Sequence, residues 1–408
     1  MSDLDDGCAP AALAAILTPI GEGGIAVVSV VGPDAFDLAG RLFRPHSTSA
    51  AKPDLRQLHY GHIVDDGEVV DEVLVRLVPA EDAPGGEATV EVNCHGGVVA
   101  VQRVLACFVE RGARVIDPET MLARRAASRI AGEAALALTR AATPLAVEAL
   151  LDQQAGALDH ALSELPWEAP ARVEEALREL LATERLGRAL SAPPRVVLVG
   201  PANAGKSTLF NALAREDRVI VCPTPGTTRD AVRAEVALGG IAVWLTDTAG
   251  ERRPASAIER DAIARSRSSA AQADLVLLVL DASAPHAVPL GSFLAAAERR
   301  LLVLNKADLG LAPWARALPD PIIISASRGD GLDQLTQRIV EALVGDAACQ
   351  PGCPVVFTAR QADLIRQALD ALSDGRLTHA QRLVAAIYQP APQPHHRTAG
   401  HQPAGSRE

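Results

Sequence analysis

Aromatic residues, cysteines and long apolar runs are all scarce in this chain of 408 residues. Phe, Trp and Tyr make up only 3% of it, so its cores must be packed from Ala, Leu and Val, which dominate the 48% of hydrophobic residues. The longest strongly apolar run, 275–280, is far too short to span a bilayer. The opening "MSDLDDGCAP" is acidic where a signal peptide would be basic. We therefore expect a soluble, cytoplasmic protein with no membrane partner.

The cysteine pattern and the charge balance exclude further classes of protein. The six cysteines show neither a disulfide framework nor paired zinc spacing. Cys349 and Cys353 form an isolated C-x3-C, whereas a structural zinc ion needs four ligands, so a metal or redox role is disfavoured there. A net charge of -11 argues against a broadly basic nucleic-acid coat and leaves room for a local basic patch.

Hydrophobic periodicity and glycine stops divide the chain into an α/β multi-domain protein. Residues 1–118 read as strands and short helices, and residues 119–190 are rich in Ala, Leu and Glu and mostly helical. Short apolar strands alternate with helices over 191–346, which predicts a mostly parallel sheet with helices on both faces. Residues 347–388 are helical again, so the sheet region is inserted in a helical domain. The Pro/His/Gly-rich residues 389–408 are expected to be a disordered tail.

The stretch "GPANAGKST" at 200–208 carries the clearest chemical signal. It matches G-x4-G-K-[ST] between a predicted strand and a predicted helix, the setting of a phosphate-binding P-loop. Backbone N–H groups and the helix N-terminus cradle the phosphates there. Lys206 reaches the β- and γ-phosphates and serves catalysis, while Ser207 offers its hydroxyl to Mg²⁺. The nucleotide-binding residues predicted from this loop are Asn203, Ala204, Gly205, Lys206, Ser207 and Thr208.

Two elements between the P-loop and the next strands indicate a nucleoside triphosphate switch. In "PGTTRD", either Thr227 or Thr228 can close on the γ-phosphate and Mg²⁺, and we assign the metal contact to Thr228. In "DTAG", Asp247 holds the metal's water shell and the Gly250 N–H senses the γ-phosphate. Both follow the order that a GTPase needs.

Two later elements select the base. "NKAD" provides Asn305, Lys306 and Asp308, and a carboxylate there accepts both the N1–H and the 2-amino group of guanine, a donor pair that adenine lacks. "SAS" provides Ser325 and Ala326 for a backbone contact to the guanine O6. Together the four elements predict a GTP-binding, GTP-hydrolysing enzyme that uses Mg²⁺.

The segment after "DTAG" leaves the hydrolytic residue open between two glutamates. In many GTPases a glutamine directly after the glycine orients the attacking water. Glu251 stands there in this chain, and Glu259 follows farther along the same segment. From the residues alone, either carboxylate could accept a hydrogen bond from water.

Read together, these motifs resemble those of the tRNA modification GTPase MnmE (TrmE) family. "PANAGKST", "PGTTRD" and "DTAG…IER" resemble its PNAGKS, GTTRD and DTAG…VER. "ILTPIGEGGIAVVSVVGPDA" and "VEVNCHGG" resemble its N-terminal T-P-x-G-x-G-G and E-x-x-x-H-G-G segments. The resemblance covers roughly residues 11–115 and 195–345. It implies a homodimeric GTPase that acts with a flavoprotein partner, similar to MnmG, on the wobble uridine of tRNA.

For the active site, the resemblance implies that Glu259 assists hydrolysis, since the family has an apolar residue at the position of Glu251. Glu251 is then interpreted as a solvent-exposed switch residue. The resemblance also implies a K⁺ ion, ligated by Asn203 and bound across a dimer of G domains, which supplies the positive charge that an arginine finger gives elsewhere.

For the N-terminal domain, the resemblance implies dimerisation and a pocket for a one-carbon donor of the 5-formyl-tetrahydrofolate type. Gly23, Gly24 and His95 are the candidate residues, with Gly21 beside them. The alternative is that these residues form strand-end turns of a dimerisation domain.

The chain also departs from the family pattern. No cysteine follows Cys353, so the family's Cys-x-Gly-Lys motif cannot be placed, and only Arg125 and Ala126 retain a trace of its central helical motif. The arginine of R-[IV]-S-G is missing near Val28. A divergent paralogue, acting as a GTP-dependent regulatory or assembly switch without modification chemistry, is therefore the alternative function.

Overall fold

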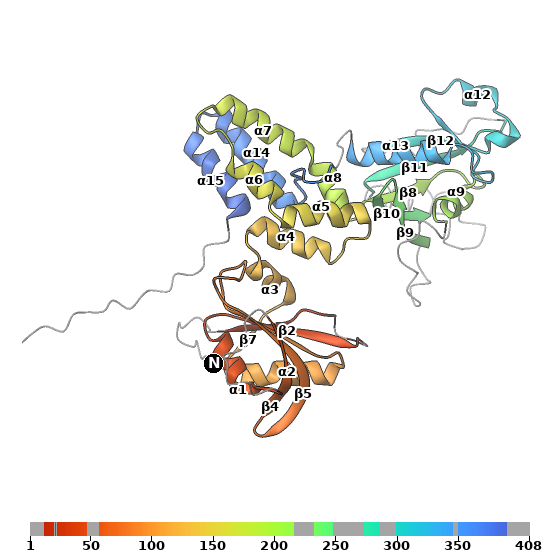
Figure 1. Ribbon diagram of the computed structural model, residues 1–408. Helices are drawn as coiled ribbons and strands as arrows, with labels where there is room; N and C mark the ends of the chain where they lie inside the picture. The colour runs from red at the N-terminus through yellow and green to blue at the C-terminus, as the bar shows by residue number, and fades with distance from the viewer. Residues whose placement is uncertain are drawn as a thin grey trace, which may run out of the picture. The chain divides into compact units, whose positions relative to one another are not determined.

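The computed structural model describes residues 12–19, 21, 23–46, 57–215, 232–247, 273–285, 299–345 and 350–389. The chain divides into two compact units (Figure 1). Unit 1 comprises Met1–Gly132 with Thr378–Glu408, and unit 2 comprises Glu133–Leu377. The helix α4 (Arg129–Leu138) spans this division, and α15 (Leu377–Tyr388) begins at the second one. The domain boundaries predicted at 118, 190, 346 and 388 stay predictions.

Unit 1 is built on a seven-stranded sheet. Its strands follow the order β3 (Phe43–Pro45), β4 (Leu58–Asp65), β5 (Glu68–Val78), β6 (Thr89–His95), β2 (Ile25–Val31), β1 (Leu13–Ile16) and β7 (Arg114–Val115). Every pairing is antiparallel except that of β1 with β7. The turn between β4 and β5 is Asp66-Gly67, and both residues have positive φ, as a two-residue hairpin turn requires.

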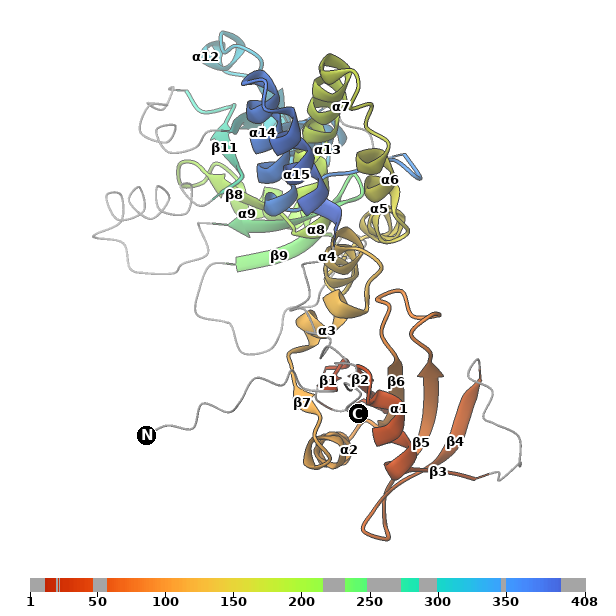
Figure 2. The same cartoon turned by 90° about the vertical axis from the view of Figure 1, so that its left-hand side faces the viewer.

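Alternating residues of this sheet are buried against helices on its two faces (Figure 2). On one face, Val28 and Val30 join a core with α1 (Ala35–Leu42) and α2 (Val98–Glu110), which contributes Phe108. On the other face, Val31 packs with Met121 of α3 (Pro118–Arg125). The strands and short helices predicted for residues 1–118 are therefore present, with α2 following directly on "NCHGG".

The helical part of unit 2 comprises α5 (Pro144–Gln154), α6 (Ala157–Ser163), α7 (Pro170–Ala182), α8 (Glu184–Ser191) and α14 (Ala359–Ser373). Prolines separate these helices, since α5 starts at Pro144 and Pro166 lies between α6 and α7. Val173, Leu177 and Leu180 form the buried face of α7, which packs against α14. Residues on both sides of the inserted sheet thus share one helical core, as predicted.

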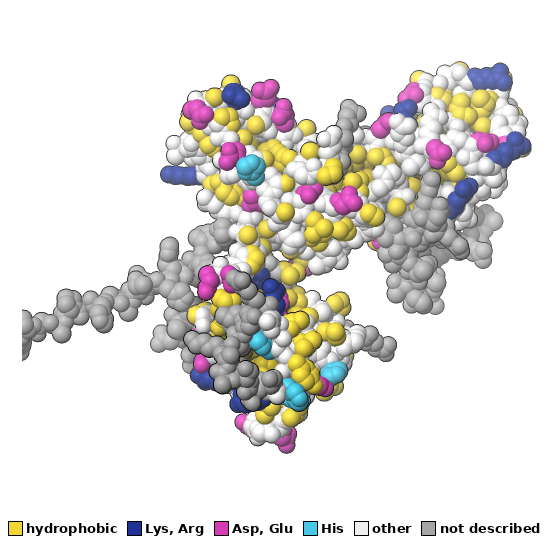
Figure 3. All heavy atoms as spheres, viewed as in Figure 1, with side chains coloured by type: hydrophobic (Ala, Val, Ile, Leu, Met, Phe, Trp, Pro, Cys, Tyr) yellow, Lys and Arg dark blue, Asp and Glu magenta, His cyan; other side chains and the backbone are white. Residues whose placement is uncertain are grey.

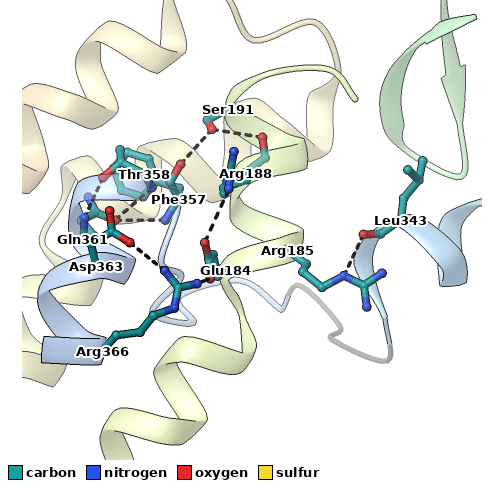
Figure 4. A network of polar contacts seen from close by, with 10 residues as sticks. All are labelled: Glu184, Arg185, Arg188, Ser191, Leu343, Phe357, Thr358, Gln361, Asp363 and Arg366. Carbon is teal, nitrogen blue, oxygen red and sulfur yellow. Dashed lines mark hydrogen bonds and ion pairs between the residues drawn. The ribbon is translucent and has the colours of Figure 1, made fainter. Parts of the chain in front are cut away.

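Helix α8 is bonded on both of its sides (Figure 4). Toward α14, Glu184 pairs with Arg366 and the Ser191 hydroxyl donates to the Phe357 carbonyl at 2.9 Å. Toward α13 (Leu332–Val344), the Arg185 guanidinium donates to the carbonyls of Ala342 and Leu343, two of the last carbonyls of that helix. Helix α8 therefore ties the helical part of unit 2 to the sheet that follows it.

The second sheet has the order β13 (Ile322–Ile323), β12 (Arg300–Asn305), β11 (Leu275–Asp281), β8 (Arg195–Val199), β10 (Ile241–Asp247) and β9 (Val232–Leu238). All its pairings are parallel except that of β9 with β10, which confirms the predicted mostly parallel sheet. One face is covered by α5, α8, α9 (Lys206–Leu213) and α13, and the other meets α12 (Pro313–Arg316).

The distribution of basic side chains and the length of the apolar helices bear on possible nucleic-acid and membrane contacts. On the face drawn in Figure 3, Lys and Arg side chains are scattered among acidic and apolar ones rather than gathered in one field. Across the part of the chain that the structure describes, no helix has the length and apolarity needed to cross a membrane.

Candidate functional site

The predicted nucleotide residues gather at the carboxyl edge of the parallel sheet in unit 2. Since β8, β10, β11 and β12 run parallel, the residues that follow them meet at one edge, where open α/β sheets bind their ligands. We call this set of residues the nucleotide edge. Its members are residues 200–208, Asp247, Asp281, residues 305–308, Ser325 and Ala326.

Backbone geometry explains the glycines of the P-loop. Gly200 has φ +145, and a methyl group there would lie 2.1 Å from the Val279 carbonyl oxygen. Gly205 has φ +88, and a methyl group there would lie 2.2 Å from Asn305 Nδ2. Both positions therefore exclude any larger residue. Asn203 also has a positive φ, 62°, and its side chain is exposed.

Lys206 opens α9 and is buried in the loop that it follows. Its Nζ donates to the carbonyls of Gly200 at 2.9 Å and Pro201 at 2.7 Å. Burial lowers the pKa of this ammonium, and the nearby Asp247 carboxylate opposes that change. The lysine thus lies at the N-terminus of a helix, beside the backbone groups that would surround a phosphate.

Ser207 and Asp247, both predicted to serve Mg²⁺, lie in contact. The Ser207 hydroxyl donates to Asp247 Oδ2 at 2.6 Å, although the two residues lie on different elements, α9 and the end of β10. A hydroxyl and a carboxylate are hard oxygen donors of the kind that Mg²⁺ prefers. These residues fit a Mg²⁺ ion held between the P-loop and β10.

Asn305 joins the P-loop to the base-reading loops. Its Nδ2 donates to the Ala204 carbonyl at 3.0 Å, and its Oδ1 accepts from the Ala326 N–H at 3.0 Å. Only 2% of Asn305 is exposed. Both ends of the amide are therefore used to fix the loops relative to one another.

Asp308 and Lys306 lie on either side of Ala307 and are each held by another side chain. The Ser325 hydroxyl donates to Asp308 Oδ1 at 2.7 Å, and the Arg328 Nε lies 3.9 Å from Oδ2. Lys306 Nζ donates to Asp281 Oδ2 at 2.7 Å. The carboxylate predicted to read guanine is thus oriented before any base arrives.

Sequence reasoning missed Asp281. It ends the run "LVLLVLD", just as Asp247 ends "IAVWLTD". A carboxylate at the end of a buried parallel strand was the signal that could have found it, because that end faces the ligand side of the sheet.

Several predicted residues lie outside the described residues. They are Thr227, Thr228, Gly250, Glu251 and Glu259, so their roles stay predictions. Cys349 of the C-x3-C pair also falls outside them. Within the ranges described, no group of three or more His, Cys, Asp or Glu side chains could hold a metal ion.

In unit 1 the structure brings together the three residues of the candidate one-carbon pocket. Ile25, directly after Gly24, pairs with His95 across β2 and β6, and the Gly96 N–H donates to the Gly24 carbonyl at 3.3 Å. A methyl group at Gly96 would lie 1.9 Å from the Gly23 carbonyl oxygen, which explains the glycine there.

Asp71, a residue that sequence reasoning missed, holds His95. Its Oδ1 lies 2.6 Å from His95 Nδ1 and its Oδ2 accepts from the His95 N–H at 2.9 Å. The hydrogen bond to Asp71 raises the pKa of the imidazole. Nothing in the spacing of "EVVDEVLV" marks Asp71 out from its acidic neighbours.

An acidic residue in β6 and another just before that strand form ion pairs with two arginines of α3. Glu91, the acid of the E-x-x-x-H-G-G segment, pairs with Arg125, and Glu87 accepts two bonds from Arg124 at 2.5 and 2.8 Å. Arg125, one of the few traces of the central motif, thus contacts another motif residue.

Comparison with known proteins covers nearly the whole chain. A family model described as "50S ribosome-binding GTPase" matches residues 195–306, and one described as "GTP-binding protein TrmE N-terminus" matches residues 12–126.

Curated relatives called "tRNA modification GTPase MnmE" match over most of their length. The one from Lacticaseibacillus paracasei is 34% identical over 89% of this chain and 88% of its own. Those from Chloroflexus aurantiacus and Symbiobacterium thermophilum are 35% and 36% identical, each over 90% of this chain and over 91% and 89% of their own. Among solved structures, the G domain of the T. maritima FeoB iron transporter is 24% identical over 36% of this chain, with a TM-score of 0.27, too low to add to these relationships.

Proposed function

The chain belongs to the MnmE family of tRNA modification GTPases and is itself a GTP hydrolase, and from this membership we propose that its GTP hydrolysis serves the modification of the wobble uridine of tRNA. The observation that carries the proposal is the extent of the match, which takes in the N-terminal domain as well as the GTPase domain. A shared GTPase domain alone would support no substrate beyond GTP.

In the proposed site, GTP lies along the nucleotide edge. Lys206 would bind the β- and γ-phosphates, Ser207 would offer its hydroxyl to Mg²⁺, Asp247 would hold the water shell of that ion, and Asp308 would accept the two N–H groups of guanine. The support is geometric, because the phosphate-binding and base-reading loops are joined through Asn305. Bound Mg²⁺ would offset the charge that develops on the phosphate oxygens. From their sequence motifs, we propose that Thr227, Thr228 and Gly250 contact the γ-phosphate and Mg²⁺ in the same site.

For the hydrolytic step, we propose Glu259 as the residue that orients water and Asn203 as a ligand of K⁺ in a dimer of G domains. Support for Asn203 comes from its exposed side chain at the rim of the P-loop, where a second subunit can reach it. Turnover should be faster in KCl than in NaCl at equal ionic strength, and Asn203→Ala should abolish the difference. Equal turnover rates of the parent protein in KCl and NaCl would contradict the K⁺ mechanism.

The choice between Glu259 and Glu251 needs its own comparison. Glu259→Ala is expected to slow turnover roughly 100-fold while GTP affinity changes little, because a residue that orients water contributes at the transition state. Glu251→Ala is the matched control, with a much smaller effect. The reverse ranking would overturn the assignment.

In unit 1 we propose a pocket for a one-carbon donor of the 5-formyl-tetrahydrofolate type at Gly23, Gly24 and His95. The support is that these residues meet at one point, where the imidazolium favoured by Asp71 can face a carboxylate of the donor. Calorimetric titration with 5-formyl-tetrahydrofolate tests it, with His95→Gln as the variant. Identical affinity for the parent and the variant would leave His95 as a turn residue.

The flavoprotein partner and the tRNA role are tested in cells. Mass analysis of wobble uridine in a strain lacking the gene, and in the same strain carrying the parent chain or Lys206→Ala, should show loss, recovery and no recovery of the modification. Pull-down of the flavoprotein by the parent chain tests the partner. Full modification in the deletion strain would instead favour a paralogue that acts as a GTP-dependent switch.

A further inference from the structure

The head group of Lys306 in "NKAD" contacts an acidic residue that lies outside the predicted nucleotide motifs. Its Nζ donates to Asp281 Oδ2 at 2.7 Å. The backbone of Lys306 has a φ of 64°, a left-handed conformation that turns the chain sharply after Asn305. Because of that turn, the side chain runs toward the end of β11 rather than out along β12.

The stem of Lys306 passes the P-loop on its way to Asp281. A methyl group at Gly205 would lie 3.9 Å from Lys306 Cε, an ordinary van der Waals separation. The side chain therefore lies beside the P-loop that takes the phosphates, at Gly205.

Asp281 is itself fixed before it meets the lysine. It ends β11 in register with Asn305 on β12, and its Oδ1 accepts from both the Ser283 N–H at 3.0 Å and the Ser283 hydroxyl at 2.6 Å. Only Oδ2 then faces Lys306. Burial raises the pKa of the Asp281 carboxyl, but the hydrogen bonds from Lys306 and from Ser283 together outweigh it and hold the pKa below its usual value, so the carboxylate is charged at neutral pH.

A lysine side chain has four rotatable bonds, and ordering it costs conformational entropy. If that order is imposed by the protein alone, the ligand does not have to impose it on binding. On this basis we propose that Asp281 is a positioning residue for guanine nucleotides, which holds the stem of Lys306 in place beside Gly205 of the P-loop. The inference rests on the proposed assignment of the nucleotide edge.

If Asp281 is a positioning residue, its loss should weaken nucleotide binding and leave the rate of the hydrolytic step nearly unchanged. Asp281→Asn keeps the size of the side chain and the bonds to Ser283 but removes the charge that fixes the ammonium. We expect GDP and GTP to bind about 10-fold more weakly in this variant, with a raised KM and a kcat within about twofold of the parent.

A double-mutant cycle tests whether Asp281 acts through Lys306. The affinity of the full chain for a fluorescent GDP analogue is measured for the parent, Asp281→Asn, Lys306→Ala and the double variant. The double variant should bind no more weakly than Lys306→Ala alone, because the partner on which Asp281 acts is already gone. Losses that multiply in the double variant would overturn the proposal, as would parental affinity in Asp281→Asn.

Two controls separate the possible failures. Asp320→Asn breaks another 2.7 Å ion pair of the same unit, with Arg338, and should leave GDP affinity unchanged. If it weakens binding as much as Asp281→Asn, the effect is general to the domain and the proposal fails. If the parent protein does not prefer GDP to ADP, the assignment of the nucleotide edge fails instead. Ser283→Ala removes the hydroxyl bond to Asp281 Oδ1 and leaves the bond from the backbone N–H, so it should give a smaller loss in the same direction.

Discussion

The nucleotide edge of unit 2 and the turn region around His95 in unit 1 both lie where strands end, but they hold their polar side chains differently. Asn305 is 2% exposed and is bonded at both ends of its amide. The His95 side chain is 64% exposed and is held by Asp71. A buried polar group must find every partner, so few residue types fit there, whereas an exposed group leaves many open.

Because of that difference, substitutions disturb side-chain contacts in one region and backbone contacts in the other. At the nucleotide edge, side chains meet backbone across several elements, so a change at one position disturbs the whole set. In unit 1, the close contact is between backbones, at Gly96 and Gly23, and the side chains lie outside it. Substitutions should therefore damage binding in one region and folding in the other.

The largest expected effect is at Gly205. Gly205→Ala places a methyl group 2.2 Å from Asn305 Nδ2 at a backbone φ of +88, so the bond from Asn305 to the P-loop must break. We expect GDP affinity to fall at least about 100-fold, measured by fluorescent-nucleotide titration. Gly40→Ala in α1, where nothing lies within 4 Å, serves as the control. Parental affinity in Gly205→Ala would show that the loops do not depend on this contact.

The counterpart in unit 1 is a pair of adjacent glycines. Gly96→Ala forces a methyl group to 1.9 Å from the Gly23 carbonyl, whereas a methyl group at Gly97 meets nothing within 4 Å. The free energy of unfolding should fall by about 3 kcal/mol for the first and by about 0.5 kcal/mol for the second. Urea denaturation of both variants measures this. Equal losses would mean that the close approach of the two turns is not what requires glycine.

A smaller effect is expected where α8 meets α13. Arg185→Ala removes the donors that satisfy the Ala342 and Leu343 carbonyls at the end of α13. We expect a loss of about 1–2 kcal/mol in unfolding free energy. Arg178→Ala, which loses only an exposed pair with Glu174 within α7, should cost about 0.5 kcal/mol or less. A loss in Arg178→Ala as large as that in Arg185→Ala would contradict the capping role.

The smallest effect is a dependence on pH in unit 1. Asp71 raises the pKa of His95 in the folded protein, so the pair stabilises the fold fully below the unfolded pKa of about 6.5 and loses that contribution as pH rises through the folded value. His95→Gln should therefore destabilise the protein near pH 5.5 and have little effect near pH 8.5. Denaturation midpoints at the two pH values measure the difference. A constant gap between the parent and His95→Gln would mean that charge plays no part.

The sequence predicted the nucleotide edge better than the unit 1 pocket for a physical reason. Gly200, Lys206 and Asn305 occupy positions where backbone conformation or burial admits almost no other residue. Their motifs can therefore be recognised from the spacing of these residues in the sequence. Asp71 was missed because it is one acid among several in its segment, and Asp281 was missed although its place at the end of a buried strand was a usable signal. Their importance depends on what lies opposite in another strand or loop, which only the fold supplies.

The central claim, that the nucleotide edge reads guanine through Asp308, is tested most directly by exchanging that carboxylate for an amide. GTP and xanthosine triphosphate affinities are measured for the parent and for Asp308→Asn. Xanthine carries a carbonyl where guanine has its 2-amino group, so an amide donor should match it. The account predicts that preference shifts toward the xanthine nucleotide by at least about 100-fold. An unchanged preference for GTP in Asp308→Asn would contradict it.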